Sequence, residues 1–313
     1  MIPLRFLLNW KFQGPNAPFL LAEDRGWFRE AGLAVSFDIG EGSGAIPPAL
    51  AAGTCDAGFG DFNALIELKA KNPGADATTV FNIYARAPMC VVSLKGRPLK
   101  SPAQLPGKRL GSPPFDTGFK MFPAFAKAAG IDPATVELVP STPAERDQRL
   151  LAGEIDGAMG FDATIMFAMR ALGRTPADFS ILYYGDHGLD VYSSAVMVAP
   201  SFARKHPDAV KGLLAAINRA WLECLRDPAP AVASVMARDK SLDPAIVGEH
   251  LRWVLDHQVP NDESRRLGLG ALDPVRIARN VTLLKDAFGL PASPAAETLY
   301  DPAFLPPFDA RRL

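Results

Sequence analysis

Asp61 and Asp162 each follow a short pattern that the sequence contains twice, at an offset of 100 residues. "LAAGTCDAGFG" precedes Asp61 and "LLAGEIDGAMGF" precedes Asp162, and the two patterns agree in register at Leu, Ala, Gly, Asp and Gly. Each pattern predicts the end of a helix, a short strand and the start of a new helix. Ligands of open α/β sheets bind beyond the carboxyl ends of strands, against helix N-termini. We therefore expect both carboxylates to border a ligand site, with capping of the following helix as the alternative role.

The last glycines of the two patterns, Gly60 and Gly160, stand where each strand is expected to end. A residue without a Cβ atom allows the backbone to approach a ligand closely. The alternative is that both glycines only serve the turn from strand to helix. The recurrence is either chance or the sign of two similar halves, and two such strand ends facing each other would make a cleft.

Residues for nucleophilic or metal chemistry are scattered. Cys55, Cys90 and Cys224 are odd in number and show neither a CxxC spacing nor a Cys/His cluster. The four histidines form no Ser/His/Asp grouping, and only His187, in "YGDHGLD", is placed to face a cleft. "GEGSG" matches neither the nucleophile-elbow motif nor the phosphate-binding loop. We expect no disulfide framework, no metal site, no cofactor and no catalytic residue.

Composition excludes several classes of partner. The 313 residues are 48% hydrophobic and 21% charged, which is typical of a globular protein long enough to form two lobes. A formal net charge of −1 supplies no long-range field for nucleic acid or an anionic membrane. No apolar run is long enough to span a bilayer, and "MIPLRFLLNW" is too short for a secretory signal. The location is either cytosolic or reached with a leader that this sequence lacks.

Short apolar runs alternate with helical patterns, which predicts an α/β fold. In the first half, strands are expected at "IPLRFLLNW", "AVSFDI" and "CDAGFGD". The glycines of "GEGSGAIPP" predict a sharp turn with Ser43 as the N-cap of a helix, whose first turn accepts Pro47 and Pro48. The second half repeats this order. After Pro200 the pattern becomes helical, with helices expected over 206–226, 229–238, 244–257 and 274–288, and the proline-rich C-terminus is expected to be an extended strap.

The opening of the chain resembles a known group of proteins. "EDRGWFREAGLAV" is similar to the "KGYFxxxGLxV" motif, and "LAAGTCDAGFGD" to the "LxxGxxDxGxxx" motif, of solute-binding proteins of ABC importers for nitrate, sulfonates, taurine and the thiamine pyrimidine precursor. An Asn-Trp pair after the first strand and a Gly/Ser turn complete the likeness, which is strongest over residues 4–68. The variant "WKFQGPNAPF" looks closest to the thiamine-precursor branch.

The resemblance implies a type 2 periplasmic-binding-protein fold with a helical C-terminal segment packed on lobe 1. Lobe 1 would comprise residues 1–87 and 193–313, and lobe 2 residues 88–192. The lobes would close over one small molecule by rotation near Arg86–Met89 and Val191–Ser194. The implied partners are this ligand and the membrane subunits of an importer, with no nucleic acid. The implied location is periplasmic or otherwise extracytoplasmic, and we expect a monomer.

Carried over position by position, the family's cleft loops fall on six short segments of this sequence. The implied ligand-binding residues are Trp10, Gln13, Ser43, Gly44, Asp61, Asn63, Phe115, Asp116, Thr117, Phe161, Asp162, Asp190 and Tyr192. Aromatic rings in this set offer flat apolar faces, and its carboxylates, amides and hydroxyls offer hydrogen bonds. Packing in the lobe core is the alternative for Trp10, a plain N-cap for Ser43, and a solvated loop charge for Asp190.

Lys11 is the only cationic side chain in these loops. A sulfonate or nitrate site would need arginines, lysines or several backbone donors, and only the helix start at Ser43 and Gly44 could seat an anion. A flat nitrogen heterocycle fits better, because rings stack on its faces and an aspartate accepts a hydrogen bond from its amine. The residues thus favour an aminopyrimidine or a similar heteroaromatic ligand, with a small organic anion as the alternative.

Two readings from other classes are disfavoured. A branch of the same fold family makes the thiamine pyrimidine from its own histidine, with pyridoxal phosphate on a lysine and a cysteine-rich iron site. "FGDFNALI" contains neither the lysine nor the histidine expected there, and the chain has no cysteine cluster. An effector-sensing domain of a transcription regulator shares the two-lobe fold, but no helix-turn-helix precedes the first strand.

Overall fold

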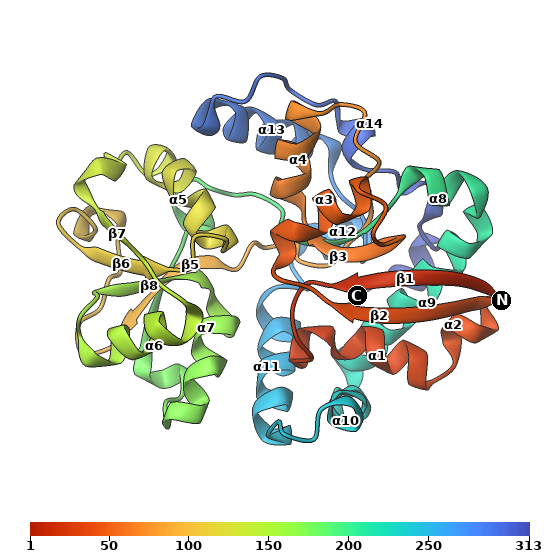
Figure 1. Cartoon of the computed structure of the whole chain (residues 1–313), viewed down its shortest axis with the longest axis horizontal. Coiled ribbons are helices and arrows are strands. Elements are labelled where there is room, and N and C mark those ends of the chain that lie inside the picture. The colour runs from red at the N-terminus through yellow and green to blue at the C-terminus, as the bar shows by residue number, and fades with distance from the viewer. The chain divides into compact units, whose positions relative to one another are not determined.

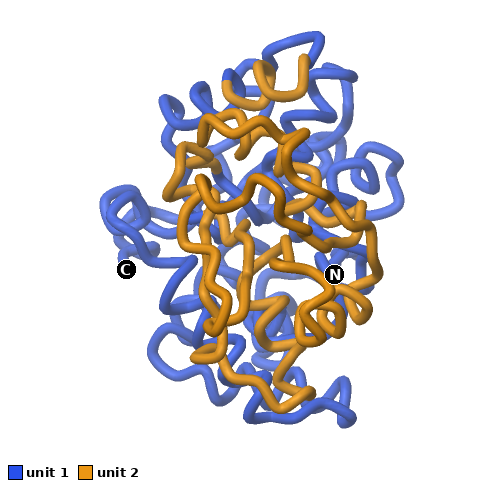
Figure 2. The backbone as a smooth tube through the Cα atoms, turned by 90° about the vertical axis from the view of Figure 1, so that its left-hand side faces the viewer, with its two compact units in different colours: residues 1–86, 192–282, 290–313 blue, residues 87–191, 283–289 orange.

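The structure, a computed structural model, describes residues 1–313. The chain divides into two compact units, and each is described by itself. Unit 1 comprises residues 1–86, 192–282 and 290–313, and unit 2 comprises residues 87–191 and 283–289 (Figure 2). Apart from the short stretch 283–289, which the contacts assign to unit 2, the chain therefore leaves unit 1 once and returns to it once.

Unit 1 is built around a five-stranded mixed sheet, with strand order β2-β1-β3-β10-β4. β1 pairs in parallel with β2 and β3, whereas β10 runs antiparallel to both β3 and β4. Helices lie on both faces of this sheet (Figure 1). The strands are β1 (Ile2–Leu8), β2 (Leu33–Ile39), β3 (Ala57–Asp61), β4 (Thr78–Asn82) and β10 (Ser194–Val198).

Unit 2 repeats this topology in the order β7-β6-β8-β5-β9. β6 pairs in parallel with β7 and β8, and β5 runs antiparallel to both β8 and β9. In each unit the antiparallel strand is the one next to a crossing between the units. The strands are β5 (Met89–Leu94), β6 (Arg109–Ser112), β7 (Glu137–Pro140), β8 (Gly157–Phe161) and β9 (Phe179–Tyr183).

The helices follow the strands much as the sequence predicts. The helices of unit 1 are α1 (Ala17–Asp24), α2 (Trp27–Glu30), α3 (Ile46–Ala51), α4 (Phe62–Lys71), α8 (Pro200–Lys205), α9 (Pro207–Arg226), α10 (Ala229–Arg238), α11 (Pro244–His257), α12 (Asp262–Leu267), most of α13 (Pro274–Phe288) and α14 (Ala296–Leu299). Those of unit 2 are α5 (Thr117–Ala128), α6 (Pro143–Ala152) and α7 (Asp162–Ala168). None of them combines the length and the hydropathy that crossing a bilayer requires.

The sequence repeat has a structural cause. Asp56, before β3, accepts a hydrogen bond from the backbone N–H of Arg5 in β1 at 2.8 Å. Asp156, before β8, accepts one from the backbone N–H of Arg109 in β6 at 2.9 Å. The backbone N–H of Asp56 in turn donates to the carbonyl of Arg5, and that of Asp156 donates to the carbonyl of Arg109. The repeated Asp therefore fixes the entry of one strand beside its parallel neighbour, once in each unit.

Aromatic side chains form the core of unit 1. Phe19 of α1 is fully buried, and its ring centroid lies 5.2 Å from Phe6, 5.1 Å from Phe59 and 6.1 Å from Trp221 of α9. Burying each of these side chains stabilises the fold by roughly 2–3 kcal/mol. The C-terminal strap is not wholly extended as predicted, because it contains α14. It is attached to unit 1 by Asp301, whose N–H donates to the carbonyl of Thr79, and by the buried Arg311.

Candidate functional site

The loops after β1 and β2 form one connected surface at the carboxyl edge of the unit 1 sheet. Asn16 donates from Nδ2 to the carbonyls of Lys11 and Trp10, at 3.0 and 3.3 Å. The backbone N–H of Gly42 donates to the carbonyl of Asn9 at 2.9 Å. The side chains of Trp10 and Gln13 are half-buried in this surface. The predicted residues of these two loops therefore belong to one edge of unit 1.

Ser43 does not cap a helix as predicted. Gly42 occupies the N-cap position of the short 3-10 helix Ser43–Ala45, with a φ of 117° that favours glycine, and no side chain caps this helix. Ser43 is its first residue and is buried, while Gly44 is half-buried. The prolines fall in the first turn of α3, as expected. The sharp turn is confirmed, but Gly42 is the N-cap of the 3-10 helix and Ala45 that of α3, so Ser43 caps neither.

Asp61 is fully buried at the end of β3 and caps α4. It accepts hydrogen bonds from the backbone N–H of Asn63 at 3.0 Å and of Ala64 at 3.1 Å, and from Ser193 Oγ at 3.2 Å. The capping alternative for Asp61 is therefore the one observed. Its contact with Ser193 joins the α4 start to the segment that enters β10.

Burial raises the pKa of Asp61 to about 6, although hydrogen bonds from Ala64, Ser193 and Asn63 act in the opposite direction. Because the folded-state pKa lies above the unfolded value of about 3.9, ionisation of Asp61 destabilises the native state. The contribution of Asp61 to the free energy of unfolding therefore falls as the pH rises from about 4 through 6. In Asp61→Asn this pH dependence should disappear. We expect the difference in free energy of unfolding, variant minus wild type, to be about 2 kcal/mol more positive at pH 6.5 than at pH 4.5. Urea unfolding at both pH values tests this; a difference that does not change with pH would contradict it.

Asn63 has one amide atom in use and one without a partner. Its Nδ2 donates to the carbonyl of Tyr192 at 2.8 Å, which fixes the orientation of the amide. Its Oδ1 is buried and accepts no hydrogen bond from the protein. Asn16 shows the same arrangement: Nδ2 donates to the loop carbonyls, and Oδ1 is buried and unpaired. The carboxyl edge of unit 1 thus contains acceptor atoms that protein donors leave unsatisfied.

Tyr192 has a structural role in unit 1. The side chain is fully buried, its hydroxyl donates to Glu263, and it accepts a hydrogen bond from the backbone N–H of Asp273 at 2.9 Å. The guanidinium carbon of Arg276 lies 4.2 Å from the ring centroid, and Phe62 packs edge-on at 5.8 Å. Both the hydroxyl and one ring face are therefore occupied by the protein, in contrast to the stacking role expected from the sequence.

The corresponding edge of unit 2 carries the remaining predicted residues. Asp116 caps α5 by accepting the backbone N–H of Gly118 at 2.7 Å, and Thr117 follows it at the start of α5. The ring of Phe115 is 48% exposed, which is unusual for a phenylalanine. Asp190 is also exposed, in the segment that leads out of unit 2.

Asp162 is fully buried and is held by a residue that the sequence analysis missed. Tyr183, the last residue of β9, donates from its hydroxyl to Asp162 Oδ2 at 2.7 Å. The backbone N–H of Ala163 donates to Oδ1 at 2.6 Å. Asp162 is the first residue of α7, whose N-cap position is occupied by the half-buried Phe161, so Asp162 is not the N-cap.

A buried arginine is the second residue that the sequence analysis missed. Arg146 of α6 is only 2% exposed, and its Nε and Nη2 lie 2.8 and 2.7 Å from Asp147 Oδ1. Burial raises the pKa of Asp116 and of Asp147, and the positive charge of Arg146 counteracts that rise in both. Burial raises the pKa of the Cys90 thiol, the charges of Asp162 and Asp116 raise it further, and the charge of Arg146 lowers it, so these groups form one buried cluster. Its position in the sequence could have indicated this burial, because Arg146 precedes the buried Leu150 by four residues and shares its helix face.

The two repeat glycines serve packing within each unit. A Cβ atom built on Gly60 would lie 2.7 Å from Ile46 Cβ of α3. One on Gly160 would lie 3.3 Å from Asp116 Oδ2 and 3.4 Å from Arg146 Nη1, and its φ of 152° also favours glycine. The space left by each missing side chain is therefore filled by the protein, which supports the turn and packing role over close approach to a ligand.

Comparison with known proteins now identifies the group. A family model described as NMT1/THI5 like matches residues 14–231. The chain belongs to the NMT1/THI5-like family. This finding confirms the resemblance to the nitrate, sulfonate and thiamine-precursor group.

Two curated relatives of this NMT1/THI5-like chain differ in their named activities. A 4-amino-5-hydroxymethyl-2-methylpyrimidine phosphate synthase of Schizosaccharomyces pombe is 25% identical over 238 residues, which cover 72% of this chain and 66% of the synthase. The chain thus spans just under two thirds of the length of that relative. Riboflavin-binding protein RibY of Chloroflexus aurantiacus is 22% identical over 303 residues, covering 93% of this chain and 82% of RibY.

Solved structures establish the fold of this NMT1/THI5-like protein. The periplasmic aliphatic sulphonate binding protein SsuA of Escherichia coli matches with a TM-score of 0.74 and 18% identity, over 98% of this chain and 94% of SsuA. A Candida albicans protein described as having the generic periplasmic binding protein fold matches with a TM-score of 0.67 and 17% identity, over 98% of both chains. The predicted α/β fold of the periplasmic-binding-protein type is therefore confirmed.

Proposed function

We propose that the protein is a solute-binding protein that delivers a flat nitrogen heterocycle, such as an aminopyrimidine, to an ABC importer outside the cytoplasm. The observation that carries the ligand class is the buried Oδ1 of Asn63, which accepts no hydrogen bond from the protein. A buried acceptor without a donor costs roughly 1–3 kcal/mol, and an N–H group of a ligand would relieve that cost. Nitrate and simple alkanesulfonates offer no such donor.

Other predicted site residues support the same class. Trp10, half-buried in the loop joined to Asn9 and Gly42, offers a ring face for stacking, and Phe115 of unit 2 offers another. Gln13, Thr117 and Asp190 add polar groups that can orient a ligand. Arg146 is cationic but buried and paired with Asp147, so it is not placed to bind an anion from solvent. The relatives named for a pyrimidine and for riboflavin share a flat nitrogen-containing ring, which agrees with this choice.

Closure of the two units over the ligand is part of the proposal, with the hinge at the two crossings between the units. In unit 1, Ser194 accepts the N–H groups of Ile83 and Tyr84, and Asn280 accepts that of Tyr192. In unit 2, the carbonyl of Pro88 accepts the N–H of Asp162. The rotation would occur where the chain passes from one unit to the other, at residues 86–87 and 191–192. The closed, liganded form would then be the one that the importer's membrane subunits recognise.

Synthase activity, suggested by the name of the S. pombe relative, has little support in the residues. The segment after β3 carries Phe62 and Asn63 where the enzyme branch would need a lysine and a histidine. Lys69, further along α4, is buried and donates from Nζ to the carbonyl of Ala75. Cys55, Cys90 and Cys224 lie before β3, in β5 and in α9, and all three are buried. These side chains do not fit pyridoxal phosphate or an iron site.

Trp10→Ala tests the proposed site directly. Removal of the stacking face should weaken binding of an aminopyrimidine at least about tenfold, while Trp10→Phe, which keeps an aromatic face, should retain most of the affinity. Isothermal titration of protein that has been unfolded and refolded, to remove carried-over ligand, gives both affinities. Equal affinity of Trp10→Ala and the wild type would remove Trp10 from the site.

A further inference from the structure

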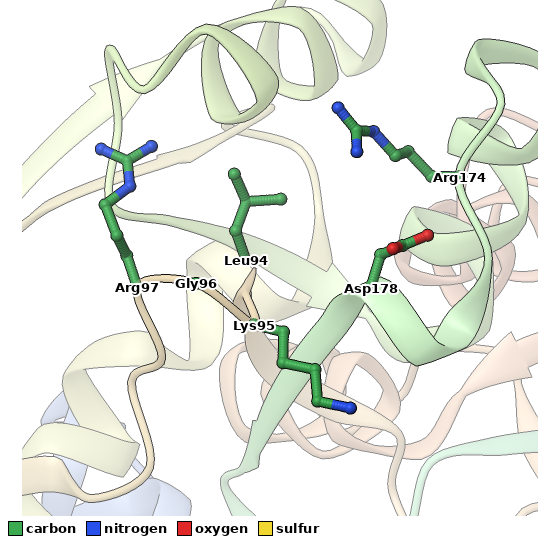
Figure 3. Close-up of a pocket in the computed structure, with 6 residues that line it drawn as sticks. All are labelled: Leu94, Lys95, Gly96, Arg97, Arg174 and Asp178. Atoms are coloured by element: carbon green, nitrogen blue, oxygen red, sulfur yellow. The ribbon is translucent and has the colours of Figure 1, made fainter.

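Unit 2 has a polar hollow at the sheet edge opposite to its candidate ligand residues. The hollow has a volume of about 310 Å³ and is lined by Leu94, Lys95, Gly96, Arg97, Arg174 and Asp178 (Figure 3). Leu94 ends β5, and it pairs with Phe179 at the start of β9. Phe161 and Tyr183, by contrast, lie at the other ends of β8 and β9. At about 3.3 Å per residue, the length of β9 separates the two regions by roughly 13 Å.

The lining of this hollow has an excess of positive charge. Lys95, Arg97 and Arg174 form no ion pair, in contrast to Arg109 and Arg146 of the same unit, which pair with Glu137 and Asp147. Asp178 is the only carboxylate in the lining, and its Oδ2 already accepts the N–H of Thr175 at 2.7 Å and its hydroxyl at 3.1 Å. These hydrogen bonds lower the pKa of Asp178, with smaller contributions from Arg174 and Lys95, so it is ionised. The lining therefore contains three cations and one carboxylate.

Backbone contacts fix the two turns that carry these cations. The N–H of Lys95 donates to the carbonyl of Asp178 at 2.9 Å, and that of Arg97 to the carbonyl of Leu94 at 2.8 Å. The guanidinium of Arg97 lies over Gly153, where a built Cβ atom would be 2.6 Å from Nη2. Figure 3 shows Arg97 and Arg174 on the two sides of Leu94, with Lys95 extending away from both. The hollow thus has two guanidinium groups as walls and an apolar floor.

We propose that this hollow binds a small oxyanion of the phosphate type, with Arg97 and Arg174 as its two forks. Guanidinium groups match the oxygen pairs of phosphates and carboxylates, and each such contact is charge-assisted. The volume lies at the lower end of the range for small-molecule sites, large enough for a phosphate with a short organic group resting on Leu94. Lys95 adds long-range attraction. The site shares no residue with the proposed heterocycle site, so the two proposals stand or fall separately.

Calorimetric titration of the full chain with pyrophosphate, inorganic phosphate and glycerol phosphate, at ionic strength matched with sodium chloride, tests the proposal. We expect saturable one-to-one binding in the wild type, and an increase of the Kd by at least about tenfold in Arg97→Gln and in Arg174→Gln. Arg204→Gln, which removes an exposed positive charge from α8 of unit 1, is the matched control and should bind as the wild type does.

The anion series distinguishes the source of the ligand. Tighter binding of glycerol phosphate than of inorganic phosphate would indicate an organic phosphate, and equal binding the free anion; both outcomes support the site. Absence of saturable binding for all three anions up to about 10 mM, or unchanged Kd values in both arginine variants, would overturn it.

Discussion

Arg146→Met is expected to lower the free energy of unfolding by about 3–5 kcal/mol at pH 7, because breaking a buried ion pair leaves an uncompensated charge. The methionine is close in length, so the loss is chiefly electrostatic. Asp147 is only 5% exposed, and in the variant its carboxylate would have no cation beside it. Asp116 would lose the positive charge that counteracts the rise of its pKa.

The pH dependence separates this cause from simple loss of packing. Both carboxyl groups already have raised pKa values, and loss of the guanidinium raises them further. They can therefore be neutralised by protonation as the pH falls, so the destabilisation should be smaller at pH 5 than at pH 7. Urea unfolding of both proteins at the two pH values measures this. Arg149→Met, three residues later on α6, should change stability by only about 0.5 kcal/mol. A loss of stability for Arg146→Met that is equal at both pH values would contradict the electrostatic account.

Gly118→Ala is expected to destabilise the protein by about 3 kcal/mol, since a tight backbone contact cannot be relieved by turning a side chain. A Cβ atom built on Gly118 would lie 2.7 Å from both the Cα and the N atom of Gly160. The start of α5, which carries Asp116 and Thr117, would have to move away from the end of β8. The variant should therefore also bind ligand more weakly.

Gly248→Ala provides a control of opposite sign. Gly248 lies inside α11, and the nearest atom to a built Cβ is Val232 Cγ2 at an ordinary 3.7 Å. Alanine is favoured over glycine inside a helix by about 1 kcal/mol, so this variant should gain stability. Urea unfolding of both variants gives the comparison. A Gly118→Ala protein as stable as the wild type would show that α5 does not require close contact with Gly160.

The sequence predicts the elements of this protein well where local signals agree. The helices at 229–238, 244–257 and 274–288 were expected with the bounds that the structure shows, because prolines and charged residues mark their ends. The repeat predicted two similar halves, and the pairing of Asp56 with Arg5 and of Asp156 with Arg109 explains it. The C-terminal strap was predicted less well, because the short α14 has too few residues to show a period.

Site residues are harder to predict, because a sequence shows residue types and not burial. Asp162, Asp61 and Tyr192 are all polar residues next to strand ends, yet each is fully buried and engaged by the protein. Arg146 was overlooked because a charged residue on an amphipathic helix usually faces solvent. Only tertiary packing, which places α6 against the end of β8, turns it inward. The unpaired Oδ1 of Asn63 likewise depends on its contact with Tyr192, 129 residues away.

The most direct test of the central proposal is calorimetric titration of refolded protein with an aminopyrimidine, riboflavin, an alkanesulfonate, taurine and nitrate. A solute-binding protein for flat nitrogen heterocycles should bind one molecule of the aminopyrimidine or of riboflavin and release it unchanged on unfolding, with affinity lost in Trp10→Ala. Saturable binding of only the sulfonate, taurine or nitrate would contradict the ligand class, and chemical conversion of a bound heterocycle would contradict the assignment as a binding protein.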